Sequence, residues 1–216
     1  MRVAPSIIAA DFSQFQKELK KAEKAGVDLL HLDIMDGVFV PNITFGPMIV
    51  EAIDKITDID LDAHLMIVHP EKYLERFIDA GTDWISFHAE AVDNVDNCIT
   101  LIKNHNKKVG LVVSPETAFL SVAHHLEKLD FFLIMSVHPG FYGQKFIPEI
   151  LHKIEEAKNY IVKHRLQCLL QVDGGINSTN VHDIARAGAD IVVAGAAVFQ
   201  SKNYKKAIEK LQCLKD

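Results

Sequence analysis

Four ionisable residues stand inside short apolar segments, where a charge without a partner would be costly: His31, Asp33, His64 and Asp173. Alternate residues of a strand share one face, so His31 and Asp33 are expected to point the same way. Two carboxylates held close together repel each other unless a cation lies between them. Two imidazoles and two carboxylates suit Zn²⁺, Fe²⁺, Mn²⁺ or Co²⁺. The sequence therefore predicts that these residues bind one divalent transition metal ion per subunit, with a metal-free buried ion network as the alternative.

Three methionines fall on the same predicted strand faces as these residues: Met35, Met66 and Met135. A thioether is apolar and polarisable, so it could pack around a metal ion and keep a reacting centre dry. We interpret the three as the lining of the metal pocket, although methionines in such places also serve as ordinary core residues.

Glycine-rich segments follow the last three apolar runs: HPGFYGQ at 138–144, DGGIN at 173–177 and AGAA at 194–197. Glycine lets backbone N–H groups approach phosphate oxygens without any net positive charge. In a barrel of alternating strands and helices, the loops after strands seven and eight commonly form a phosphate site. We therefore expect a phosphate here, and the longer HPGFYGQ segment could act as a lid. The alternative is that the glycines only mark turns.

The apolar runs alternate with charged segments of helical spacing, such as 12–25 and 147–163. Short runs that are apolar on both faces and joined by helices indicate buried parallel strands. Eight of them, each followed by a helix, predict a (β/α)8 TIM barrel that forms a single domain over residues 1–216. An open doubly wound sheet is the alternative. The predicted strands are Val3–Ala9, Leu29–Met35, Leu61–Val68, Trp84–His88, Val109–Val113, Phe131–Val137, Leu169–Asp173 and Ile191–Ala194.

A short repeat supports the barrel. The pattern Ala-Gly-x-Asp occurs at 25–28, 80–83 and 187–190, just before predicted strands two, four and eight. Asp130 stands in the matching place before strand six, without the Ala-Gly. Glycine suits the left-handed residue that closes a helix, so the repeat indicates that every second strand–helix unit is built alike.

The composition narrows the possible partners. The net charge of −6 argues against nucleic acid, and no apolar run approaches the length that crosses a bilayer. We therefore expect neither a nucleic-acid nor a membrane partner. The three cysteines, Cys98, Cys168 and Cys213, are widely spaced and odd in number, which disfavours a disulfide framework and favours a reducing cytoplasm.

A metal ion beside two carboxylates, with a phosphate site next to it, suggests chemistry on a sugar phosphate. Asp33 and Asp173 lie on strands three steps apart around an eight-stranded ring, so they can address opposite faces of one substrate. If one removes a proton from carbon and the other returns a proton from the far side, the centre is inverted. These residues therefore predict an epimerase.

The segments APSIIAADFS, HLDIMDGVFVPNITFGP, DAHLM, SVHPGFYGQKFIP, QVDGGIN and AGADIVVAGAAVF together resemble the ribulose-5-phosphate 3-epimerase family along nearly the whole chain. The resemblance implies a ribulose-phosphate-binding barrel that interconverts ribulose 5-phosphate and xylulose 5-phosphate in the pentose phosphate pathway. It implies that His31, Asp33, His64 and Asp173 bind the metal and that Asp33 and Asp173 are the acid/base pair. It also implies a homo-oligomer, because relatives commonly form dimers or hexamers. The implied substrate-binding residues are Ser6, His64, Gly140, Phe141, Tyr142, Gly143, Gly174, Gly175, Gly195 and Ala196.

Two departures from the family pattern concern the substrate side. Ala196 stands where many relatives carry serine, so a hydroxyl contact to the phosphate would be missing, and Tyr142 occupies a position often filled by glycine. One alternative function is an epimerase of a hexulose 6-phosphate such as D-allulose 6-phosphate. Another, from a different class, is a sugar-phosphate-binding barrel without catalytic activity. The presence of both Asp33 and Asp173 argues against the second alternative.

Overall fold

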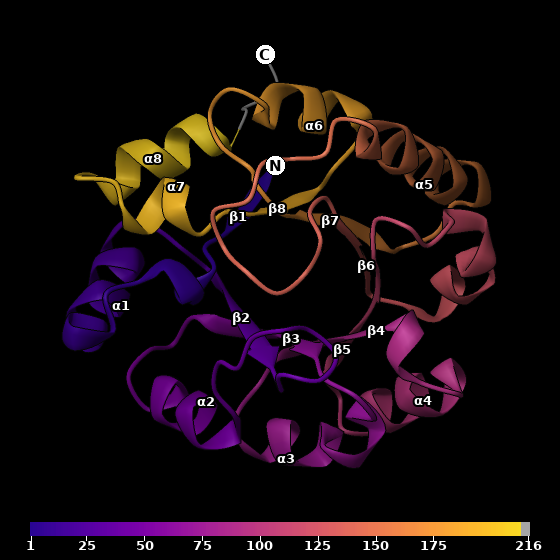
Figure 1. Ribbon diagram of the computed structural model, residues 1–216, viewed down its shortest axis with the longest axis horizontal. Helices are drawn as coiled ribbons and strands as arrows, with labels where there is room; N and C mark the ends of the chain where they lie inside the picture. The colour runs from indigo at the N-terminus through magenta and orange to yellow at the C-terminus, as the bar shows by residue number, and fades with distance from the viewer. Residues whose placement is uncertain (213–216) are drawn as a thin grey trace.

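The computed structural model describes residues 1–212, which form a ring of parallel strands surrounded by helices (Figure 1). One sheet of eight strands runs in the order β1-β8-β7-β6-β5-β4-β3-β2, and every pairing is parallel. The strands are β1 Arg2–Ala4, β2 Leu29–Met35, β3 Asp60–Met66, β4 Trp84–His88, β5 Lys108–Val113, β6 Phe131–Met135, β7 Leu169–Asp173 and β8 Ile191–Val193.

The two ends of this sheet meet next to the predicted metal site. Beyond the end of β1, Ser6 forms a parallel bridge with His31 of β2, and the N–H of His31 donates to the Pro5 carbonyl at 3.0 Å. This contact brings the first and last strands of the order together, so the ring is nearly closed. The (β/α)8 barrel is therefore confirmed, and the open doubly wound sheet is wrong.

Helices connect the strands on the outside of the ring. The α-helices are α1 Phe15–Lys24, α2 Pro47–Asp54, α3 Leu74–Asp79, α4 Val95–Asn104, α5 Ile150–His164, α6 Val181–Ala187, α7 Ala196–Phe199 and α8 Tyr204–Leu211. Shorter 3₁₀ turns are η1 Ile7–Ala9, η2 Phe12–Gln14, η3 Pro70–Lys72, η4 Ala89–Ala91, η5 Phe119–Ser121 and η6 Ala123–Lys128. No helix within residues 1–212 has the length and hydropathy needed to cross a bilayer.

One connection differs from the prediction that each strand is followed by a helix. Between β5 and β6 the chain forms only the 3₁₀ turns η5 and η6. Its buried apolar residues are Phe119, Val122, Ala123, Leu126 and Leu129, and the four larger ones are three or four positions apart. A 3₁₀ helix has three residues per turn, so it can keep side chains at this spacing on the barrel side.

The first predicted strand is shorter than expected. Residues Val3–Ala9 were predicted as one strand, but β1 ends at Ala4 and η1 follows at Ile7. Pro5 has no N–H to extend the ladder, and the Ser6 side chain caps η1 by accepting the N–H of Ile8 at 3.4 Å. The turn leaves Ser6 at the mouth of the barrel, where the sequence predicts substrate.

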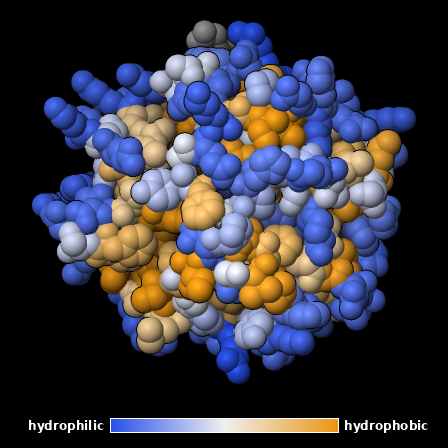
Figure 2. Space-filling view, in the orientation of Figure 1, coloured by the Kyte–Doolittle hydropathy of each residue, from blue (hydrophilic) through white to orange (hydrophobic). Residues whose placement is uncertain are grey.

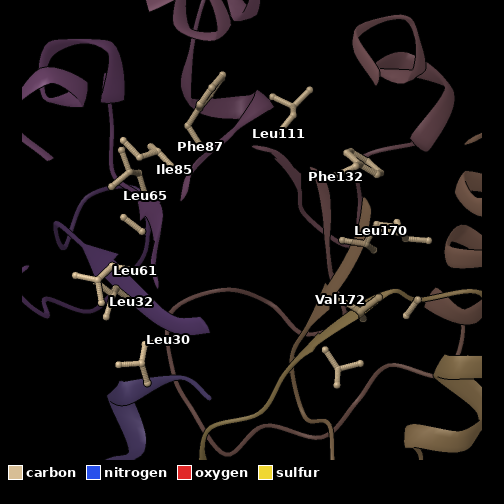
Figure 3. Packing of buried hydrophobic residues seen from close by; sticks show 14 of the residues in the cluster. Leu30, Leu32, Leu61, Leu65, Ile85, Phe87, Leu111, Phe132, Leu170 and Val172 are labelled. Carbon is tan, nitrogen blue, oxygen red and sulfur yellow. The ribbon is translucent and has the colours of Figure 1, made fainter. Parts of the chain in front are cut away.

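Alternation along the strands separates the core from the barrel interior. In β2 the side chains of Leu30, Leu32 and Ile34 belong to the large apolar core that also holds Leu19 of α1 and Val50 of α2. Figure 3 shows part of this core, and the residues labelled in it all come from strands β2 to β7. The intervening residues of β2 therefore point into the barrel, as the period of two predicts.

The Ala-Gly-x-Asp repeat has a structural role. Gly26, Gly81 and Gly188 all have positive φ, as expected of residues that end helices. The aspartates that follow bind the start of the preceding strand. Asp83 accepts the N–H of Leu61, Asp130 that of Val109 and Asp190 that of Leu170, at 2.9–3.0 Å, while Asp28 accepts Arg2 Nε at 2.9 Å. The strands are thus tied in pairs at the end of the barrel opposite the site.

Candidate metal centre and active site

Three strands bring the four predicted metal ligands together. His31 and Asp33 lie on β2, His64 lies opposite Asp33 on the neighbouring β3, and Asp173 ends β7. One ligand atom from each residue lies within 4.8 Å of the other three. His31 and His64 are fully buried, whereas 8% of the Asp33 side chain and 13% of the Asp173 side chain remain exposed. The carboxylates are therefore the members of the cluster that a substrate can reach.

The distances show how closely the two carboxylates approach the same pair of imidazoles. Asp33 Oδ1 lies 3.5 Å from both His31 Nε2 and His64 Nδ1. Asp173 Oδ2 lies 3.8 Å from the first nitrogen and 3.9 Å from the second. The two nitrogens are 3.3 Å apart. The four atoms form a compact set of the kind that holds a divalent transition metal ion.

Each imidazole has a partner behind it that fixes its ring. His31 Nδ1 lies 2.8 Å from Asp62 Oδ2, and Gln171 Nε2 donates to the same oxygen at 2.8 Å. His64 Nε2 lies 3.0 Å from Nε2 of His88 on β4. Contacts of this type orient metal-binding histidines and set the position of the ring proton.

Without a cation the cluster holds protons in its place. Burial would lower the pKa of His31, but the Asp62 and Asp33 carboxylates outweigh it and raise this pKa well above its usual value. Burial would raise the pKa of Asp33, but His31 and His64 outweigh it and hold this pKa well below its usual range. Burial and the neighbouring Asp33 carboxylate raise the pKa of Asp173 to about 7. Burial lowers the pKa of His64 to about 4, so this ring is neutral at neutral pH and has a lone pair available for a metal ion. A divalent cation bound in this small space would displace the protons that His31 and Asp173 hold without it.

A cavity of about 410 Å³ opens at the C-terminal end of the strands, directly above the cluster. Asp33 and Asp173 line it, and so do all three predicted methionines, while His31 and His64 lie beneath its wall. Neither lysine nor arginine is among the described residues that line the cavity. A phosphate bound here would therefore rely on N–H groups and neutral side chains. The predicted residues in the lining are Ser6, Asp33, Met35, Met66, Met135, Gly140, Phe141, Tyr142, Gly143, Asp173, Gly174, Gly175, Gly195 and Ala196.

Two loops cover the mouth of this cavity. The segment between β6 and α5, drawn in salmon, crosses in front of the ring, with the loop after β2 beside it (Figure 1). Asn42 Nδ2 donates to the Gly140 carbonyl at 2.8 Å and joins the two loops. Phe141 and Tyr142 at the tip are more than half exposed. In Figure 2 hydrophobic side chains gather near the centre of this face, with hydrophilic ones around the rim.

The glycines after β7 are required by close packing. Gly174 has φ +124°, and a Cβ there would lie 2.6 Å from the Val137 side chain. Gly175 has φ +65°, and a Cβ there would lie 2.4 Å from the backbone nitrogen of Phe146. Within residues 1–212 no hydrogen-bond acceptor is recorded for the N–H groups of Gly175 and Gly195, both of which line the cavity. These two donors are available to an anion.

The model of the Ribulose-phosphate 3 epimerase family matches residues 2–199 of this chain, a range that includes the whole cluster and all residues lining the cavity except Gln200. The chain belongs to the ribulose-phosphate 3-epimerase family. The ribulose-phosphate 3-epimerase of Bacillus subtilis is 46% identical over 213 residues, which cover 98% of each chain. That of Escherichia coli K12 is 41% identical over 211 residues, or 97% of this chain and 94% of the relative. These matches confirm the resemblance seen in the sequence motifs, and the function of the chain is that of an epimerase.

Solved structures with the same fold are more distant in sequence. The 3-hexulose-6-phosphate synthase of Salmonella typhimurium has 19% identity and a TM-score of 0.70, covering 98% of this chain and 97% of the other. KGPDC from Streptococcus mutans has 12% identity and a TM-score of 0.72, covering 98% and 95%. At such identities the likeness shows the barrel alone, so the substrate must be argued from the epimerase family and the site.

Sequence reasoning left the residues behind the ligands without a role. Alternation placed Asp62 and Gln171 on the inner faces of their strands, and that signal could have identified them as partners of a metal-binding histidine. For His88 the sequence indicates no partner. Its contact with His64 depends on the pairing of β3 with β4 and has no signature within either segment. Cys98 and Cys168 are buried and free, and Cys213 lies outside the described residues.

Proposed function

We propose that this chain interconverts D-ribulose 5-phosphate and D-xylulose 5-phosphate, with Asp33 and Asp173 as the acid/base pair. The observation that carries the proposal is the convergence of these two carboxylates, from strands on opposite sides of the cavity mouth, on the same two imidazoles. The family supports the epimerisation, and the cavity supplies the space for a substrate between the carboxylates.

The reaction requires one base and one acid on opposite faces of carbon 3. In the metal-free cluster the pKa of Asp33 is held low and that of Asp173 is raised to about 7, so the two carboxyl groups differ in how readily they take up a proton. Asp33 would remove the proton from carbon 3, and the electron pair of the broken C–H bond would move toward the neighbouring carbonyl. Asp173 would then give its proton to the opposite face of the same carbon. The reverse reaction exchanges the two roles.

The residues that would hold the divalent metal ion are His31, Asp33, His64 and Asp173. When bound, such an ion supplies positive charge that stabilises negative charge on the substrate oxygens next to carbon 3. The set does not select among Zn²⁺, Fe²⁺, Mn²⁺ and Co²⁺. The thioethers of Met35, Met66 and Met135 would keep water away from the reacting carbon.

The phosphate of the substrate would lie over the ends of β7 and β8. The free N–H groups of Gly175 and Gly195 are the donors we assign to it, and Gly174 and Ala196 complete that wall of the cavity. Ala196 offers no hydroxyl, so the backbone must provide the contact. Ser6 lies next to Gly195, where a Cβ on the glycine would be 3.6 Å from Ser6 Cβ. Its hydroxyl donates to Asp33 Oδ2 and can orient both this carboxylate and the substrate. His64 is fully buried, so we assign it to the metal rather than to direct substrate contact.

The experiment compares two sugar phosphates. The protein is loaded with each of the four metal ions in turn, and formation of D-xylulose 5-phosphate from D-ribulose 5-phosphate is followed beside turnover of D-allulose 6-phosphate. We expect kcat/KM for the pentulose to exceed that for the hexulose by at least about tenfold, a difference of about 1.4 kcal/mol in transition-state binding. A larger kcat/KM for the hexulose would favour the alternative substrate. No turnover of either would contradict the proposal.

Three further expectations remain predictions. The single domain over residues 1–216, the homo-oligomer and the cytoplasmic location each need a measurement of their own. For the oligomer the structure offers exposed apolar side chains at the barrel mouth, among them Val38, Ile43 and Met48, each more than 70% exposed. Sedimentation of the purified protein would give the number of subunits.

A further inference from the structure

A chain of three side chains leads from the metal cluster to the edge of the barrel. His64 Nε2 lies 3.0 Å from His88 Nε2, and His88 Nδ1 lies 3.3 Å from Glu90 Oε2. Both histidines are fully buried, whereas 28% of the Glu90 side chain is exposed. The proposed epimerisation uses neither His88 nor Glu90, so their role is open.

The contacts allow only one arrangement of protons when His64 binds a metal ion. The nitrogen of His64 that faces the other three ligands is Nδ1, so this atom must carry no proton. The proton of the neutral ring is then on Nε2 and is donated to His88 Nε2. His88 must therefore carry its own proton on Nδ1, which is donated to Glu90 Oε2. A carboxylate at the end suits this chain because it can only accept.

Glu90 is itself held in one orientation. Its other oxygen, Oε1, accepts the backbone N–H of Ser114 at 2.8 Å and the hydroxyl of Thr117. A backbone N–H can only donate, so the atom at the Oε1 position must be an oxygen. Within residues 1–212, Ser114 Oγ is the other hydrogen-bonding atom near His88 Nδ1, and it is farther away at 3.5 Å.

We propose that Glu90, acting through His88, fixes the proton of the His64 ring on Nε2 and so sets the affinity of the metal centre. Glu90 is a positioning residue, because it touches neither the ligand atoms nor the cavity. The inference rests on the proposed function in one respect, namely that His64 binds the metal through Nδ1.

The substitution Glu90→Gln separates this role from a structural one. The amide oxygen must take the Oε1 position to accept the N–H of Ser114, which places the NH₂ group against His88 Nδ1. Two donors would then face each other unless the His88 proton moves to Nε2. The proton on His88 Nε2 would then face the proton on His64 Nε2. In the metal-binding tautomer of His64, the Nε2–H group would have no acceptor.

The first experiment measures metal affinity by titrating the metal-free protein with Co²⁺ and recording visible absorption. We expect Glu90→Gln to weaken binding by about 10- to 100-fold, the usual effect of losing a partner behind a metal ligand. We also expect Glu90→Gln to bind more weakly than Glu90→Ala, which imposes no donor on His88. A purely structural role predicts the opposite order, because glutamine preserves the shape and alanine does not. Thermal melting confirms that each variant is folded.

The matched control is Glu71→Gln. Like Glu90, Glu71 contacts the histidine two positions before it, and its Oε1 lies 3.2 Å from His69 Nδ1. This pair is on the surface. We expect this variant to bind Co²⁺ as the unsubstituted protein does. Equal affinity of the Glu90→Gln variant and the unsubstituted protein, or tighter binding by Glu90→Gln than by Glu90→Ala, would overturn the inference while leaving the proposed function intact.

A second measurement does not depend on metal binding. Nitrogen-15 NMR of the metal-free protein reports which ring nitrogen of His88 carries the proton. We expect Nδ1–H in the unsubstituted protein and Nε2–H in Glu90→Gln. The same tautomer in both proteins would overturn the inference, and an unsubstituted protein that binds no Co²⁺ would instead contradict the proposed metal centre.

Discussion

At the scale of single residues, the site depends on hydrogen bonds that hold Asp33 in place. Its Oδ2 accepts the hydroxyl of Ser6, and its backbone carbonyl accepts Thr44 Oγ1 at 2.6 Å. Asp33 Oδ1 is left to face His31 and His64. Oδ2 of this carboxylate therefore holds the side chain in position, while Oδ1 faces the proposed metal site.

The first prediction concerns Ser6→Ala. A hydrogen bond to a charged group is worth about 1.5–3 kcal/mol, so losing it should lower kcat by about 10- to 100-fold through a misplaced Asp33. Steady-state kinetics with D-ribulose 5-phosphate would measure this. The control is Ser13→Ala, which removes a serine-to-aspartate hydrogen bond on the surface, from Ser13 Oγ to Asp11 at 2.6 Å. An unchanged kcat in Ser6→Ala would contradict the positioning role.

The second prediction concerns acid stability. Burial would raise the pKa of Glu90, but hydrogen bonds from His88, Thr117 and the Ser114 N–H outweigh it and lower this pKa to about 2, below the ordinary 4.5. A lowered pKa stabilises the folded protein above the ordinary value, and this stabilisation is lost as the pH falls from about 4.5 toward 2. We expect the stability difference between the unsubstituted protein and Glu90→Gln to shrink from pH 5 to pH 3. Urea unfolding at both pH values would measure it, and a difference that widens would disprove the assignment.

At the scale of strands and helices, the aspartates of the repeat join neighbouring strands. Asp190 accepts the N–H of Leu170 at 2.9 Å and also pairs with Lys158, whose Nζ lies 2.7 Å from Oδ1. Both contacts are at the end of the barrel away from the cavity. Residues at that end are expected to affect stability rather than chemistry.

The third prediction follows for Asp190→Ala. Loss of the acceptor leaves the Leu170 N–H and the Lys158 ammonium without their partner, so we expect a loss of about 1–3 kcal/mol in the free energy of unfolding. The kcat of the folded variant should stay within about twofold. Asp183→Ala is the control, because Asp183 forms only an exposed pair with Arg186 at 3.5 Å, and such pairs contribute about 0–1 kcal/mol. A large fall in kcat for Asp190→Ala would contradict the separation of stability from chemistry.

At the level of strands and helices, the sequence could predict part of the fold and of the site. The period of two in β2 and β3 placed His31, Asp33 and His64 in the barrel interior, because one face of each strand must pack against helices. The 3₁₀ connection after β5 was missed, because Phe119 and Leu126 also fit a helical pattern when read alone. His88 and Glu90, which lie behind His64, were missed for another reason. They come from β4 and the turn after it, so only the folded chain brings them to His64.

At the scale of the whole molecule, a metal ion held by the four proposed ligands would join β2, β3 and β7. These strands are distant in sequence, and the ring is closed near the site where Pro5 and Ser6 meet His31. Binding to the folded state alone must therefore stabilise the entire barrel. We also propose that the barrel unfolds as one cooperative unit, which calorimetry would show as a single transition with equal calorimetric and van't Hoff enthalpies.

The fourth prediction is a metal-dependent melting temperature. A free metal concentration 100 times the dissociation constant should add roughly 2.7 kcal/mol, which raises Tm by about 5–10 °C for a protein of this size. A chelator should reverse the shift and stop turnover. The variant His64→Ala should show little shift with the same ion. A Tm and a turnover rate that ignore both metal and chelator would contradict the metal centre.

The measurement that tests the central claim most directly is deuterium exchange at carbon 3 in Asp33→Asn and Asp173→Asn, each first shown to hold its metal ion. With only one of the two groups left, each variant should lose epimerisation by at least about 100-fold. Each should still exchange the carbon 3 proton of one epimer with D₂O, and the two variants should act on opposite epimers. Exchange of the same epimer by both variants, or epimerisation at the full rate in either, would show that these carboxylates do not serve the two faces of one carbon.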